Sequence, residues 1–121
     1  MFENTRSDKK TQQLLLQGMT YELIPLKNVH DQAKFLPQNS TMSVTSSPAK
    51  TIDDTLDLCE SFSADGHTTI PHFAARMVES EEHVDLIIDR VHRQGIRKIF
   101  VIGGDADQRG PFTMLQVSFK Q

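Results

Sequence analysis

Three short apolar runs recur along this chain at an interval that is typical of one kind of fold. Their centres lie near residues 44, 71 and 100, so successive runs are 27 and 29 residues apart. This interval is the length of one strand, one helix and their connections. Alternating strands and helices form a parallel sheet with right-handed crossovers. The sequence therefore predicts an α/β protein with about four parallel strands and intervening helices.

The order of the elements follows from hydrophobic spacing and from turn residues. Thr51 and Ser80 are suitable N-caps, and Gly66 and Gly95 are natural helix stops. Pro71 interrupts the third strand. We expect strands at residues 20–25, 42–45, 68–75 and 99–102, and helices at 28–36, 52–65 and 81–94. The apolar stripes of the two longer helices are predicted to be Ile52, Thr55, Leu56, Cys59 and Phe62, and Val84, Ile87, Ile88 and Val91.

The last apolar run, residues 99–102, stops abruptly at Gly103-Gly104-Asp105. A short and fully apolar run bounded by turn residues favours a strand that is buried on both faces. Ligands of α/β proteins bind at the carboxyl ends of such strands. The run therefore predicts a ligand site at Asp105.

Composition excludes several classes of protein. The net charge of -3 offers no electrostatic case for binding nucleic acid. No apolar stretch approaches the roughly 18 residues of a membrane span, and the N-terminus lacks a secretory h-region. Cys59 is the single cysteine, so no internal disulfide is possible. We expect a cytoplasmic protein.

Four predicted strands end in a polar or otherwise chemically useful residue. These residues are Glu22, Thr45, His72 and Asp105. The carboxyl ends of parallel strands lie at one edge of a sheet, so two carboxylates, a hydroxyl and an imidazole are expected to converge on one cleft. His67 and His72 do not have the spacing of metal ligands, and no metal site is predicted.

Each of these residues also has an ordinary structural interpretation. Glu22 suits a solvated sheet edge, and threonine is common in strands such as the one ending at Thr45. His72 could be a hydrogen-bonded core histidine, and Asp105 could cap a turn. Cys59 falls on an apolar helix face and is expected to be an inert core residue.

In their order and spacing, these motifs resemble the methylenetetrahydrofolate reductase family. The similarity spans roughly residues 18–112. It rests on Tyr21-Glu22-Leu23-Ile24-Pro25, Ser43-Val44-Thr45, Pro71-His72, Gln94-Gly95-Ile96-Arg97 and Gly103-Gly104-Asp105.

The resemblance implies a (β/α)8 barrel that binds FAD at its carboxyl-terminal face. It also implies that NADH or NADPH reduces the flavin, which then reduces 5,10-methylenetetrahydrofolate to 5-methyltetrahydrofolate for methionine synthesis. Glu22 would be the general acid, which needs an apolar setting to raise its pKa. Leu23 and Ile24 are candidates for that setting. Asp105 would tune the flavin and folate reactions, while Thr45, His72, Gly104 and Asp105 would contact the cofactor.

Two features depart from the family pattern. Gly103 occupies a position where many members carry an arginine, which removes a cation beside the flavin and weakens the case for FAD. A complete barrel needs about 250 residues, so residues 19–112 would form only its N-terminal half. Residues 1–18 are expected to be flexible, and residues 113–121 to be an irregular, truncated tail.

An isolated half barrel is expected to be unstable, oligomeric or inactive. It would have two unpaired sheet edges. Two alternatives stay open. The chain could be a small, non-enzymatic α/β ligand-binding module, or an inactive gene fragment.

Overall fold

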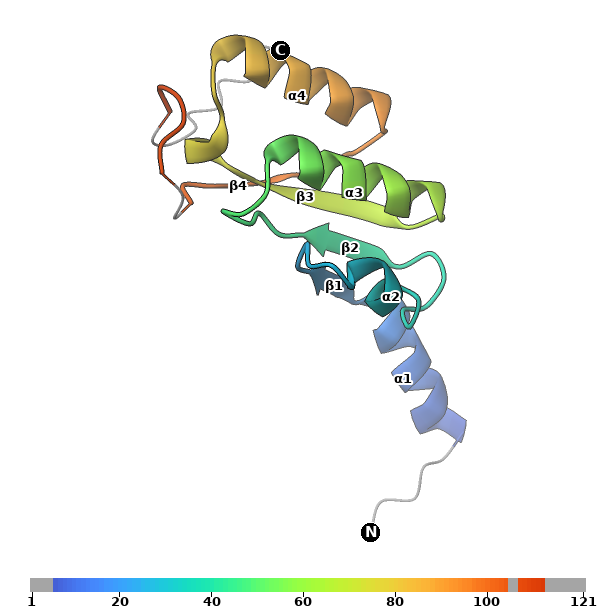
Figure 1. The fold of residues 1–121 in the computed structure, drawn as a ribbon. Helices are drawn as coiled ribbons and strands as arrows, with labels where there is room; N and C mark the ends of the chain where they lie inside the picture. The colour runs from blue at the N-terminus through green and yellow to red at the C-terminus, as the bar shows by residue number, and fades with distance from the viewer. Residues whose placement is uncertain (1–5, 105–106, 113–121) are drawn as a thin grey trace.

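The computed structural model describes residues 6–104 and 107–112, which form one parallel sheet covered by helices on one face (Figure 1). The strands follow one another in sequence order across the sheet, and all three strand pairs are parallel. The strands are β1 (Thr20–Leu23), β2 (Thr41–Val44), β3 (Thr68–Ala74) and β4 (Phe100–Ile102). The helices are α1 (Arg6–Gly18), α2 (Val29–Ala33), α3 (Ile52–Ala64) and α4 (Glu81–Arg93), with a short 3-10 turn at Ala75–Met77. The predicted α/β class and the four-stranded parallel sheet are confirmed.

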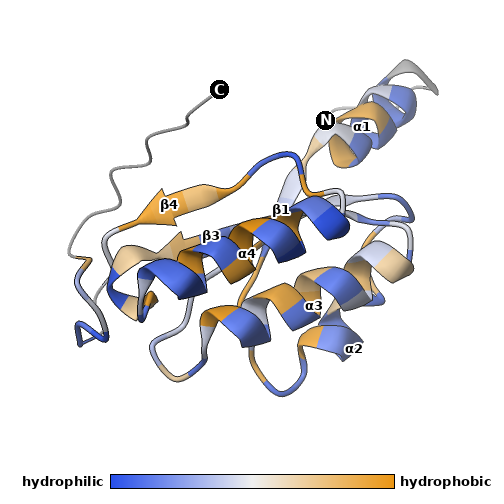
Figure 2. Cartoon of the chain, turned by 90° about the horizontal axis from the view of Figure 1, so that it is seen from above, coloured by the Kyte–Doolittle hydropathy of each residue, from blue (hydrophilic) through white to orange (hydrophobic). Residues whose placement is uncertain are grey.

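The core lies between the sheet and helices α2, α3 and α4, which Figure 2 shows on the same side of the strands. Strand residues alternate between the two faces, and one set points toward the helices. Val44 and Phe62 belong to a cluster under α2 and α3. Phe73, Leu56 and Ile87 belong to a second cluster under α3 and α4. No described helix packs against the opposite face of the sheet, which we call the open face; α1 projects on that side beyond the ends of the strands (Figure 2).

Local capping chemistry explains where the two long helices begin. The Thr51 hydroxyl accepts a hydrogen bond from the Asp54 amide, and the Asp54 carboxylate accepts one from the Thr51 amide. This capping box satisfies two otherwise unpaired amides, and these bonds to Thr51 lower the pKa of Asp54. Ser80 caps α4 by accepting from the His83 amide. Both predicted N-caps are confirmed.

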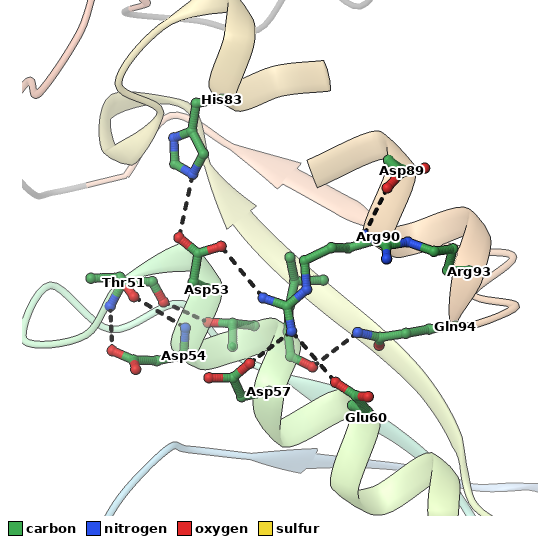
Figure 3. A network of polar contacts seen from close by, with 12 residues as sticks. Thr51, Asp53, Asp54, Asp57, Glu60, His83, Asp89, Arg90, Arg93 and Gln94 are labelled. Carbon is green, nitrogen blue, oxygen red and sulfur yellow. Dashed lines mark hydrogen bonds and ion pairs between the residues drawn. The ribbon is translucent and has the colours of Figure 1, made fainter. Parts of the chain in front are cut away.

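Helices α3 and α4 are joined by a cluster of charged side chains around Arg90 (Figure 3). The Arg90 guanidinium lies 2.7 Å from the Asp57 carboxylate, 3.4 Å from Asp53 and 3.6 Å from Glu60. His83 Nε2 lies 3.6 Å from the second carboxylate oxygen of Asp53. Burial lowers the pKa of Arg90, but the hydrogen bond to Asp57 and the three carboxylate charges outweigh it and raise that pKa.

Strand β4 corrects one prediction. Residues 99–102 were expected to be buried on both faces, but all four are exposed, and Phe100 retains 55% of its accessible surface. The physical reason is that β4 is a sheet edge within the described chain, with β3 as its only neighbour. Ile88 was placed on the buried stripe of α4, yet it is 48% exposed, because no other helix or strand within residues 6–104 and 107–112 packs over that flank of α4.

Two further elements differ from expectation. Residues 6–18 form helix α1, where a flexible segment was expected. Figure 1 shows α1 extending away from the β1 edge of the sheet. Strand β3 runs without interruption through Pro71. A proline fits there because β4 begins opposite His72, so no ladder bond from residue 71 is lost.

Candidate functional site

Glu22, Thr45 and His72 lie on the same face of the sheet. Glu22 pairs with Ser43, and Ser43 pairs with Ile70. Thr45 lies two residues after Ser43, and His72 lies two residues after Ile70. Side chains two residues apart along an extended segment point to the same side. The three predicted site residues therefore share the open face.

These residues are not in contact with one another. β2 separates β1 from β3, so Glu22 and His72 are about 10 Å apart or more, given strand spacings of about 4.8 Å. No hydrogen bond or ion pair joins any two of the three in the described structure. The four-strand part of the chain does not bring them into one closed cleft.

Glu22 lacks the apolar setting expected for a general acid. Its side chain is exposed. Leu23 is buried among residues of the opposite, helix-covered face, and Ile24 is 55% exposed. Neither neighbour therefore forms an apolar pocket around the Glu22 carboxyl group.

His72 has an unmet capacity to form hydrogen bonds. Its ring lies edge-on to Phe100, with centroids 5.0 Å apart and an interplanar angle of 63°. The Nε2 atom is buried and has no partner in the described structure. Most buried polar atoms in native proteins are paired. The Nε2 atom of His72 is therefore a group for which a bound ligand would supply the missing hydrogen-bond partner.

Thr45 has a structural role that the sequence did not reveal. Its amide donates a hydrogen bond of 2.9 Å to the Leu23 carbonyl, and its hydroxyl donates to the same oxygen over 3.3 Å. Thr45 therefore extends the ladder between β1 and β2. Its hydroxyl proton is used, while the oxygen lone pairs remain free to accept a hydrogen bond from a ligand.

Backbone geometry explains the glycine at position 104. Gly104 has a φ of +91°, and a Cβ atom there would lie 2.8 Å from the Cβ of Ala74. The Gly103 carbonyl accepts a hydrogen bond from the Arg76 amide. Glycine is thus required by close approach to β3 and by the left-handed backbone. Asp105 lies outside the described residues, so its predicted convergence with Glu22, Thr45 and His72 stays a prediction.

Two clefts were not anticipated from the sequence, and neither is lined by Glu22, Thr45 or His72. A cleft of about 320 Å³ lies beside α2 and the start of α3, where Leu26, His30 and Lys50 are among its lining residues. A cleft of about 580 Å³ lies beside the first half of β3 and the segment 94–98. The adjacent cations Arg97 and Lys98 were the available sequence signal for the second cleft.

Among residues 6–104 and 107–112, no three His, Cys, Asp or Glu side chains are grouped to hold a metal ion. No helix in those ranges is long and apolar enough to cross a bilayer. Comparison with protein families, curated proteins and solved structures found no match to this chain.

Proposed function

We propose that the open face is part of the active site of an oxidoreductase similar to methylenetetrahydrofolate reductases. The observation that carries this proposal is the placement of Glu22, Thr45 and His72 on one face, with the buried Nε2 of His72 unpaired. Parallel strands in sequence order, with helices on one face only, are also the arrangement of a (β/α)8 barrel. We therefore interpret the sheet as part of such a barrel.

The side chains on this face suit distinct roles. When bound, FAD would supply hydride transfer between NADH or NADPH and a folate substrate. His72 would contribute a hydrogen bond from its buried Nε2, and Thr45 would offer its oxygen as an acceptor. Glu22 would hold the proton that activates 5,10-methylenetetrahydrofolate. Gly104 and Asp105 would complete the cofactor contacts at the end of β4.

The proposal requires a cover over the open face. Glu22 is exposed, and both β1 and β4 are edges of the four-stranded sheet. Eight strands close a barrel of this kind. The proposal therefore places further strands, from a longer chain or from a second copy in a homo-oligomer, against these edges.

Flavin binding tests the cofactor role of His72. The purified chain is titrated with FAD, and flavin fluorescence and absorbance are recorded. We expect saturable binding that weakens several-fold, up to about tenfold, in His72→Ala, which is the loss of one buried hydrogen bond. His92→Ala, at an exposed position on α4, is the matched control and should bind like the unmodified chain. Absence of binding, or equal losses in both variants, would refute the role of His72.

Measurements of flavin and folate reduction test the role of Glu22 as the general acid separately from cofactor binding. Glu22→Gln removes the proton but keeps the size of the side chain. We expect NADH or NADPH to reduce bound flavin at an unchanged rate, while reduction of methylenetetrahydrofolate is lost. Unchanged folate reduction would show that Glu22 is not the acid. Flavin binding without any reduction would instead favour a non-enzymatic ligand-binding module, for which the solvent exposure of Glu22 is the supporting observation.

A further inference from the structure

The cleft of about 580 Å³ lies at the amino-terminal end of β3, opposite to the end that carries Gly104. Figure 1 shows the connection from α4 to β4 at this same end of the sheet. The volume lies within the range of small-molecule sites, about 300–1,000 Å³. Its location makes it independent of the function proposed above.

The cleft exists because β4 is shorter than β3. β3 begins at Thr68, but β4 pairs only with residues 72–74. The Thr68 amide donates to the Ser40 carbonyl on the β2 side. The backbone N–H and C=O groups of successive strand residues point alternately to the two neighbouring strands. Those of Thr69 therefore point away from β2, to the side where β4 does not reach. No hydrogen bond links Thr69 to residues 94–98 in the described chain, and its N–H is a free donor.

The charge of the cleft is positive. Arg97 and Lys98 both line it, both are exposed, and neither has an ion-pair partner among the described residues. No aspartate or glutamate lines the cleft, although the chain as a whole carries a net charge of -3. The last turn of α4 also ends here. Three carbonyls of that turn already accept hydrogen bonds from the amides of residues 94–96, which limits their repulsion of an anion.

His67 and Gln94, two further polar residues of the cleft, indicate which hydrogen-bonding groups a ligand needs. His67 accepts a hydrogen bond at Nδ1 from the Ser40 amide, so its neutral ring carries the proton on Nε2 and can donate. Gln94 donates from Nε2 to the Leu56 carbonyl, but its Oε1 is buried without a partner. The residues that line the cleft therefore supply several donors and cations, and Gln94 among them carries one acceptor without a partner.

We propose that this cleft binds a small phosphorylated molecule that also carries hydroxyl groups. Phosphate oxygens accept charge-assisted hydrogen bonds from Arg97 and Lys98, together with a bond from the Thr69 amide. A ligand hydroxyl donates to the unpaired Oε1 of Gln94. A phosphate with an attached polyol satisfies both the donor-rich part of the cleft and its single unmet acceptor.

Calorimetric titration of the full chain tests this assignment, with ribose 5-phosphate, inorganic phosphate and ribose as probes. We expect ribose 5-phosphate to bind more tightly than inorganic phosphate, and ribose not to bind. The double variant Arg97→Ala/Lys98→Ala should weaken ribose 5-phosphate at least about tenfold, because two charge-assisted hydrogen bonds are lost. The control Lys9→Ala/Lys10→Ala removes the same charge from two exposed positions on α1 and should bind as the unmodified chain does.

A second variant addresses the hydroxyl contact. Gln94→Leu should weaken ribose 5-phosphate several-fold, on the order of one hydrogen bond, and leave inorganic phosphate unchanged. Thermal melts of each variant confirm that the fold is retained. The proposal is overturned if ribose 5-phosphate does not bind, or if the two double variants lose affinity equally, which would indicate nonspecific ionic attraction. It is also overturned if Gln94→Leu weakens both phosphate probes alike.

Discussion

Replacing Arg90 with methionine tests whether the charged cluster between α3 and α4 stabilises the fold. The guanidinium contacts three carboxylates of α3 and is only 22% exposed, whereas those carboxylates are 57–67% exposed. An exposed ion pair contributes roughly 0.2–1 kcal/mol. The 2.7 Å pair with Asp57 should lie near the top of that range, and the two longer pairs near the bottom. Methionine keeps the aliphatic packing of the arginine stem.

The expected loss in the free energy of unfolding is therefore about 1–2 kcal/mol, which corresponds to a Tm shift on the order of 4–16 °C for a chain of about 100 residues. Arg93→Met is the matched control. Arg93 pairs with Asp89 on the same helix, and both side chains are mostly exposed. Such an i,i+4 pair contributes about 0.3–0.5 kcal/mol.

Urea unfolding at low salt and at 1 M salt distinguishes the electrostatic contribution from packing. Salt at 1 M shortens the screening length to about 3 Å, so the difference between Arg90→Met and the unmodified chain should shrink. An Arg90→Met variant no less stable than Arg93→Met would refute the reasoning. A loss that salt does not change would also refute it, because it would identify packing as the cause.

Two further perturbations test the core and the end of β4. Burial raises the pKa of the Cys59 thiol to about 11, partly offset by a hydrogen bond with Thr69. The thiol of the unfolded chain ionises at a lower pH than that of the folded chain, so the free energy of unfolding should fall as the pH rises from about 9 to about 11. Urea unfolding midpoints are measured across this pH range for the unmodified chain and for Cys59→Ala, and the difference between the two pH slopes is the contribution of the thiol. Equal slopes in the two chains would contradict the prediction. Gly104→Ala should cost about 1–3 kcal/mol, because it strains a positive φ and presses on Ala74. Gly18→Ala, which meets open space, should change the melting temperature little, and equal shifts in the two variants would refute the close-approach argument.

The two long helices show why local features could be predicted. An N-cap needs only a side chain that reaches an amide two or three residues away, so Thr51 and Ser80 act within their own segments. The helical stop at Gly95, with a φ of +69°, is equally local. Cys59 was placed in the core because α3 has a single well-covered apolar stripe, and it is fully buried.

Exposure could not be predicted in the same way, because it depends on neighbours elsewhere in the chain. Residues 99–102 have the composition of an interior strand, yet β4 is exposed because no described strand pairs with its outer edge. Ile88 on α4 is exposed because no other described helix or strand packs over it. For Glu22, the identity of its sequence neighbours did not predict its setting, because Leu23 points to the opposite face of the sheet.

The sequence by itself determined the order of strands and helices from residue 20 onward, the caps of the two long helices and the parallel direction of the sheet. Order and caps depend on hydrogen bonds within a few residues and on periodic burial, and the parallel direction follows from the helix-length connections between strands. Only the tertiary structure decided that Glu22, Thr45 and His72 share an open face. It also decided that Thr69 faces a cleft beside Arg97 and Lys98. Strand register and strand length determine which distant residues become neighbours, and neither is specified by a local pattern.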